Sequence, residues 1–193
     1  MQEGAMKLEK NQIIGRSREK GLTLLEMLIV VVILGILAMI IVPQISGSSD
    51  DAKVSTLKTN LSTMRGAIEL YYQQHGSVYP GAIKTDGSAA VGTTAEAATA
   101  FTNQMATYSQ TSGKASSDSS TLTAPIFGPY MKGGALPANP FNNLNTVKCD
   151  ITTTDINAAR TADNTVGWQF IVKTGMLFPS DTGSSSSIAH VTY

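Results

Sequence analysis

The 193-residue sequence is poor in cysteine, histidine, aromatic residues and charge. Its one cysteine, Cys149, excludes a disulfide within the chain and any metal site built from several cysteines. Its two histidines, His75 and His190, lie far apart in the sequence and leave little for a histidine-based metal or catalytic cluster. Charged residues make up 15% of the chain, against roughly 25% in a typical soluble domain. Because the formal net charge is zero, bulk charge predicts no nucleic-acid partner.

The apolar residues are concentrated in one run from Leu22 to Val42, which contains a single charged residue, Glu26, and no basic residue. About 21 residues at 1.5 Å each form a helix roughly 30 Å long, which matches the hydrocarbon thickness of a bilayer. The run therefore predicts a membrane-inserted helix. An ordinary secretory signal is the alternative, but the apolar core of such a signal is shorter, and Glu26 argues against it.

A basic segment, residues 1–21, precedes the apolar run. It has five basic and three acidic residues, and the basic ones cluster next to the run. By the positive-inside tendency, the N-terminus is expected to stay in the cytoplasm. Everything after Pro43 is then expected to lie outside the inner membrane.

A second helical segment follows the apolar run. Pro43 removes a helical hydrogen-bond donor, so a kink or a locally melted turn is expected around Ile41–Gly47. The helix is expected to restart at Ser48 or Ser49, and Gly76 suits its C-terminal stop. Between these points, apolar residues recur at spacings of three and four along one helix face: Val54, Leu57, Leu61, Met64, Ile68 and Tyr71.

The rest of the chain is rich in small and polar residues, and its pattern predicts short elements. A second short helix is expected over about 94–109, and the Ser/Thr-rich stretch from Ser109 to Thr123 has the composition of a loop. Thr174-Gly175 suits a hairpin turn. Strands are expected at Val147–Thr152, at Gly167–Val172, from Met176 to Phe178 and, as a final edge strand, at Ile188–Tyr193. This order of elements predicts an α+β fold.

The residues Lys20-Gly21-Leu22-Thr23-Leu24-Leu25-Glu26 resemble the processing site of class III signal peptides, which belong to type IV prepilins and type II secretion pseudopilins. Members of this family have a basic leader that ends in glycine, a hydrophobic first mature residue and a glutamate at the fifth mature position. Gly21, Leu22 and Glu26 match these positions, although the common first mature residue is phenylalanine. The resemblance implies cleavage between Gly21 and Leu22 by prepilin peptidase, followed by N-methylation of Leu22.

Glu26 is the residue with the sharpest functional prediction. A carboxylate inside lipid costs roughly 3 kcal/mol or more, so it needs a partner. Cleavage after Gly21 creates an α-amine on Leu22, one helical turn before Glu26, so a contact within one chain is feasible. In the family, the glutamate is thought to meet the amine of a neighbouring subunit. We therefore expect Glu26 to act in assembly; the alternative is a carboxylate that reaches outward to the membrane surface.

The resemblance also implies the pilin fold. In this fold a long N-terminal helix, membrane-inserted over its first half and amphipathic over its second, packs on a small C-terminal antiparallel β-sheet with long loops. The chain is accordingly expected to divide into a cytoplasmic leader (1–21), a transmembrane and assembly helix (22–46) and an extracytoplasmic globular domain (47–193). A helix kink is expected at Pro43.

Major pseudopilins often bind calcium in the loops of this domain. Four aspartates are available here, but their spacing does not make a calcium loop: Asp150, Asp155, Asp163 and Asp181. We therefore expect no metal and no cofactor, with calcium as the open alternative. Cys149 is expected to be a buried small hydrophobic residue rather than a nucleophile. Trp168 and Phe170 are expected in the core.

These features predict a prepilin-like structural subunit of a type IV pilus, with a type II secretion pseudopilin as the alternative and no enzymatic activity. A membrane-anchored enzyme or binding domain is a third hypothesis, but no nucleophile–base, metal or phosphate-loop pattern supports it. The expected partners are copies of the chain or homologous pilins, prepilin peptidase, an inner-membrane assembly platform and, before assembly, membrane lipid. The expected location is the bacterial inner membrane, as a single-pass protein, and then a surface pilus or a periplasmic pseudopilus.

Overall fold

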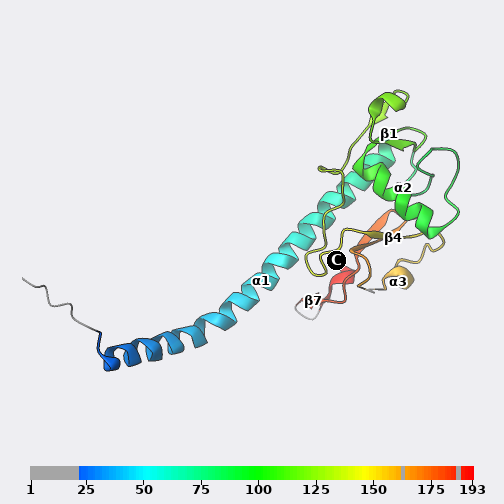
Figure 1. The fold of residues 1–193 in the computed structure, drawn as a ribbon. Coiled ribbons are helices and arrows are strands. Elements are labelled where there is room, and N and C mark those ends of the chain that lie inside the picture. The colour runs from blue at the N-terminus through cyan, green and yellow to red at the C-terminus, as the bar shows by residue number, and fades with distance from the viewer. Residues whose placement is uncertain (1–21, 162–163, 186–187) are drawn as a thin grey trace, which may run out of the picture. The chain divides into compact units, whose positions relative to one another are not determined.

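The computed structural model describes residues 22–161, 164–185 and 188–193. The leader predicted at residues 1–21 lies outside this range. The chain divides into two compact units, Met1–Ile45 and Ser46–Tyr193. Figure 1 shows that the second unit, called the head here, contains all the strands together with the shorter helices.

Helix α1 extends from Leu24 to Gln74. Its backbone is helical throughout Ile41–Gly47, so the melted turn and the restart expected at Ser48 or Ser49 are wrong. A proline inside a helix removes one hydrogen bond, and a long helix can tolerate this loss. The kink expected at Pro43 falls next to the boundary between the two units and stays a prediction.

The C-terminal end of α1 is closed as the sequence predicts. Gly76 has a φ of +65°, a left-handed conformation that costs glycine little. The backbone N–H of Ser77 donates to the carbonyl of Tyr72 at 3.0 Å, and the N–H of His75 donates to the carbonyl of Tyr71 at 3.0 Å. This arrangement resembles the Schellman motif, which satisfies carbonyl groups that the end of a helix leaves open.

The predicted apolar stripe of α1 forms one wall of the core. Val54 is half-buried, and the other five residues are at most 2% exposed: Leu57, Leu61, Met64, Ile68 and Tyr71. Helix α2, Thr94–Ala106, confirms the predicted short helix and is capped by Thr93, whose hydroxyl accepts the N–H of Glu96. Its buried face joins the same hydrophobic cluster through Ala97, Phe101 and Met105. Trp168 and Phe170 complete the cluster as predicted.

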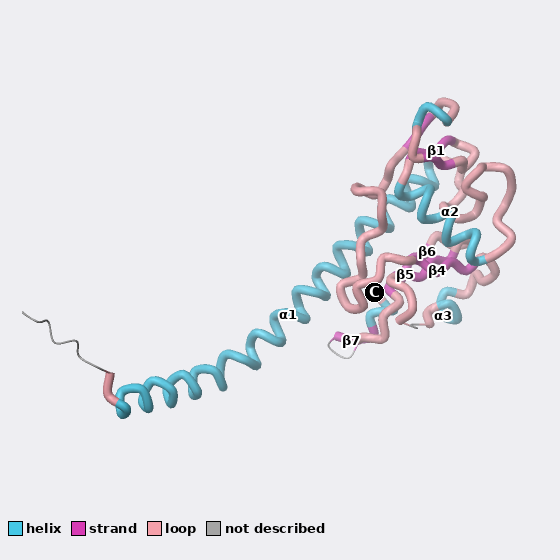
Figure 2. The backbone as a smooth tube through the Cα atoms, in the orientation of Figure 1, coloured by secondary structure: helices cyan, strands magenta, loops and turns pink. Residues whose placement is uncertain are grey.

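The largest sheet consists of β4 (Val147–Asp150), β5 (Trp168–Ile171) and β6 (Met176–Pro179), side by side in that order (Figure 2). Strands β5 and β6 pair antiparallel across the predicted turn at Thr174-Gly175. Strands β4 and β5 pair parallel, with Val147 opposite Trp168. The α+β class is confirmed, but this sheet is mixed rather than antiparallel. Parallel neighbours need a long crossover connection, and here the connection contains α3, Ile156–Ala159.

Two smaller sheets depart from the sequence prediction. Residues 109–123 were expected to form a loop, yet this part of the chain contributes β1 (Tyr108–Gln110), β2 (Ala115–Ser116) and a 3-10 turn η1 (Ser119–Thr121). Strand β3, Ile126–Phe127, pairs with the other side of β1. The expected edge strand at Ile188–Tyr193 is wrong beyond its first two residues, because β8 (Ile188–Ala189) pairs with β7 (Ser184–Ser185) and is followed by the 3-10 turn η2 (His190–Thr192).

Candidate assembly site

The first part of α1 carries apolar side chains on all of its faces, and these side chains are exposed among the residues that the structure describes. The large apolar residues between Leu22 and Met39 are 46–86% exposed. A helix that is apolar all round is stable only when other helices or lipid surround it. This exposed segment is therefore the strongest candidate for a surface that binds other helices or lipid. Within the described residues, no helix combines the length and the hydropathy required to cross a bilayer.

Glu26 and Thr23 form a reciprocal cap at the start of α1. The N–H of Glu26 donates to the Thr23 hydroxyl at 3.2 Å, and the N–H of Thr23 donates to Oε2 of Glu26 at 3.4 Å. This is the capping-box arrangement, in which two N–H groups that the helix leaves open find side-chain partners. Both contacts are at the long end of the hydrogen-bond range. The spacing Thr-x-x-Glu is the signal in the sequence that identifies it, and the role of Thr23 was missed there.

The other predicted site residues lie on either side of this cap. Gly21 is outside the described residues, whereas Leu22 is exposed and precedes the first helical residue, Leu24. Pro43 lies within the helical backbone of α1. The geometry thus brings together Thr23 and Glu26, with Leu22 adjacent, while Pro43 is more than four helical turns further along the chain.

The head offers little for catalysis or metal binding in its described part. Cys149 is 1% exposed, and burial raises the pKa of its thiol to about 12, so it is not an activated nucleophile. The carboxylates of Asp150 and Asp155 accept backbone N–H groups of the residues just after them, at 2.7–2.9 Å. Asp163 lies outside the described residues. Among the residues that are described, no three His, Cys, Asp or Glu side chains are grouped to hold a metal ion.

Comparison with known proteins places the motif in a family of sequences. Residues 16–42 match the family model for the prokaryotic N-terminal methylation motif. This segment includes Gly21, Leu22 and Glu26, so the predicted resemblance to pilins and pseudopilins is confirmed. The match is confined to this N-terminal motif.

Individual relatives narrow this class. The chain is 43% identical over 56 residues to the type II secretion system core protein G of Pseudomonas aeruginosa. The aligned segment covers 29% of this chain and 39% of that protein. It is 38% and 40% identical over 63 residues to the proteins of the same name from Klebsiella pneumoniae and Vibrio cholerae. The matches span 39–44% of the length of these relatives. No solved structure matches the chain.

Proposed function

We propose that the chain is a pseudopilin-like structural subunit of a type II secretion system. We favour the pseudopilin over the type IV pilus subunit expected from the sequence, because the relatives described above are type II secretion core proteins. The observation that carries the proposal is the methylation motif at residues 16–42, joined to a capped helix whose apolar side chains are exposed on every face. Such a helix is suited to packing against copies of itself.

In this proposal the chain first enters the inner membrane through its apolar segment, with the leader in the cytoplasm. Prepilin peptidase cuts between Gly21 and Leu22, and Leu22 is N-methylated. The assembly platform then moves the subunit from lipid into a periplasmic filament, in which the apolar part of α1 packs among the helices of other copies. The same side chains are thus covered by lipid before assembly and by protein after it.

The capping box defines what Glu26 contributes to assembly. Its Oε2 accepts the N–H of Thr23 in the same chain, and a carboxylate has the capacity to accept a second donor at Oε1. After cleavage, the amine on Leu22 of a neighbouring copy is a suitable partner. Pairing within an apolar filament core neutralises both charges, and it fixes the register of adjacent helices because an unpaired buried charge is costly.

A secretion assay tests this function directly. Deleting the gene in its host should abolish secretion of the substrates of the type II system, and the wild-type chain should restore it. The variant Glu26→Ala should enter the membrane without restoring secretion. Normal secretion in the deletion strain, combined with loss of surface filaments, would instead favour the type IV pilus and would overturn the proposal.

A further inference from the structure

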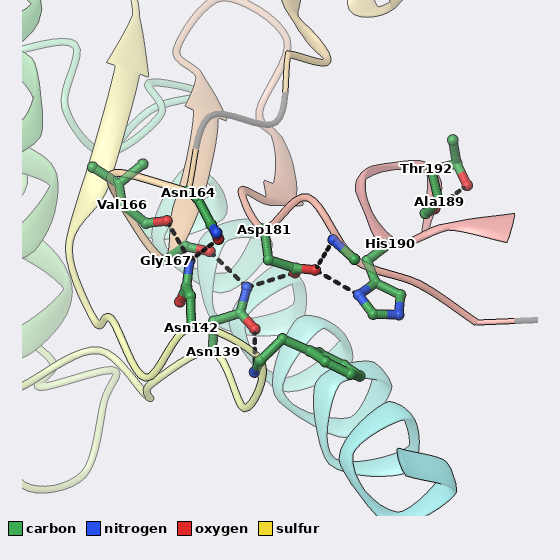
Figure 3. A network of polar contacts seen from close by, with 11 residues as sticks. Asn139, Asn142, Asn164, Val166, Gly167, Asp181, Ala189, His190 and Thr192 are labelled. Atoms are coloured by element: carbon green, nitrogen blue, oxygen red, sulfur yellow. Dashed lines mark hydrogen bonds and ion pairs between the residues drawn. The ribbon is translucent and has the colours of Figure 1, made fainter. Parts of the chain in front are cut away.

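The chain that follows β6 is joined to the head by a buried polar cluster around Asp181 (Figure 3). Asp181 and His190 are 2% and 1% exposed, and Asn139 is fully buried. Nδ1 of His190 lies 2.5 Å from Oδ1 of Asp181, and the N–H of Gly183 donates to the same oxygen at 3.0 Å. Nδ2 of Asn139 donates to Oδ2 of Asp181 at 2.9 Å. Three donors from three parts of the chain therefore meet one carboxylate.

The orientation of Asn139 is fixed by its own contacts. Its Oδ1 accepts the N–H of Phe141 at 3.0 Å, so its amino group has to face the other way. That amino group also donates to the carbonyl of Gly167 at 3.1 Å, which ties the cluster to the start of β5. A buried carboxylate with hydrogen bonds on both oxygens is stable, whereas removal of a partner leaves a buried charge unpaired.

The surroundings leave no space in the cluster for another group. The ring of Phe141 packs on His190 with 3.9 Å between centroids. A Cβ on Gly183 would come within 2.7 Å of the His190 ring and 2.8 Å of Asp181. The N–H of His190 also donates to the carbonyl of Gly183 at 3.0 Å. Asp181 and His190 thus close the loop between them through both side chains and backbone.

The cluster positions the end of the chain against α1. His190 begins η2, and the carbonyl of Tyr193 accepts a hydrogen bond from Nη2 of Arg65 at 2.6 Å. The ammonium of Lys58 lies 4.7 Å from the centre of the Tyr193 ring. The charged groups that flank this segment are therefore Arg65 and Lys58 on α1, while Asp181 faces His190 from the end of β6.

The donor set does not fit the calcium that resemblance to pseudopilins suggests. Calcium takes six to eight oxygen ligands in an open arrangement. Both oxygens of Asp181 already accept N–H donors, and an imidazole nitrogen lies in contact with one of them. A nitrogen atom thus occupies the position that a cation requires, so the carboxylate of Asp181 bonds to groups of the protein and is not arranged as a calcium ligand.

We propose that the Asp181–His190 pair, supported by Asn139, is an internal clasp that fixes the turn η2 to the residues just after β6 without a metal ion. In this pair the ring nitrogen of His190 occupies the side of the Asp181 carboxylate that a calcium ion would need. The clasp does not depend on the proposed role in secretion, since it concerns only the folding of the head. Its consequence is that the clasp forms without calcium and that the stability of the head depends on His190.

The test uses the full chain in detergent micelles, with thermal unfolding followed by the fluorescence of Trp168. Wild-type protein should give the same Tm in millimolar calcium and in a chelator. His190→Leu should lower the Tm by about 6–20 °C, because it removes the ring nitrogen from a buried carboxylate and leaves only the Asn139 and Gly183 donors. His190→Asn places an amide donor near the position of Nδ1 and should recover part of this loss. Thr192→Ala, on the same turn, is the control: it removes an exposed hydroxyl that donates to the carbonyl of Ala189 at 2.6 Å, and it should lower the Tm by no more than about 4 °C.

Amide exchange in the wild-type chain keeps the test informative if His190→Leu fails to fold. The N–H of His190 should be protected to the same degree with calcium and with the chelator. Two results would overturn the clasp: a Tm or a protection of His190 that rises with calcium, or a His190→Leu variant as stable as Thr192→Ala.

Discussion

The two halves of α1 present their apolar side chains in different ways. From Leu24 to Met39, the large apolar residues are exposed on every face of the helix. From Leu57 to Tyr71, five apolar residues form one stripe that is at most 2% exposed. The other faces are mostly polar, although Leu70 is 51% exposed. The second half is covered by the chain's own head, while the first half needs a cover from outside. One helix thus contributes to the folding core over one half and, in the proposed function, provides the assembly surface over the other.

The largest expected effect is that of replacing Glu26, which should impair assembly without changing the stability of the head. Glu26→Ala should reduce filament assembly by about a hundredfold or more, because the amine of a neighbouring subunit loses its partner in an apolar surrounding. The Tm of the head should not change. Quantifying sheared or cross-linked filaments checks the first effect, and thermal unfolding checks the second. Glu26→Gln is the matched control: it keeps the capping box but removes the charge, so assembly by this variant would assign the role to the cap instead.

A substitution in the second half of α1 should instead lower the stability of the fold. Leu61→Ala removes a side chain that is 2% exposed in the core and should lower the free energy of unfolding by about 2–5 kcal/mol. Leu28→Ala, on the exposed half, should change it by less than about 0.5 kcal/mol. Urea unfolding of both variants gives the comparison. Equal losses would show that the two halves do not differ in the way described.

A substitution at Gly175 tests how closely the turn between β5 and β6 packs on Tyr79, which follows α1. The φ of Gly175 is +73°, and a Cβ there would come within 2.2 Å of the Tyr79 ring. Gly175→Ala should therefore destabilise the head by about 1–3 kcal/mol. Gly133 has a similar φ of +83° but open space around it. Gly133→Ala isolates the backbone strain, so the difference between the two unfolding free energies measures the steric clash alone.

The smallest expected effect concerns His75, which lies just beyond the end of α1. Burial lowers the pKa of His75, although its Nδ1 contacts the Tyr71 carbonyl at 2.9 Å. In the unfolded chain His75 takes up a proton at about pH 6.5, whereas in the folded chain it takes up a proton only at a lower pH. Stability should then be unaffected above pH 7 and should fall as the pH decreases from about 6.5 towards the lowered pKa. Urea midpoints measured across this range should flatten in His75→Leu; an unchanged slope would assign the acid sensitivity to other groups.

Local signals in the sequence predicted much of this fold. The 3–4 spacing from Leu57 to Tyr71 identified the buried stripe, and Gly76 identified the helix end, because each depends on residues within a few positions. The motif around Gly21 and Glu26 was equally local. The same reasoning missed the capping role of Thr23, although its spacing to Glu26 is visible in the sequence.

Features that depend on distant residues could not be predicted in this way. The parallel pairing of Val147 with Trp168 depends on how the connection between them crosses the sheet. The pairing of Asp181 with His190 depends on the path of the intervening loop and on Asn139, which lies 42 positions before Asp181. The short strands near Ser109 formed despite a loop-like composition, because β1 has partners on both sides.

The intact mass of the membrane-extracted chain tests the central claim most directly. If the exposed half of α1 is a processed assembly surface, the mature protein should begin at Leu22, lack residues 1–21 and carry one additional methyl group. Gly21→Val should leave the leader attached in the same preparation. A wild-type chain that still begins at Met1, in cells with an active prepilin peptidase, would contradict the account.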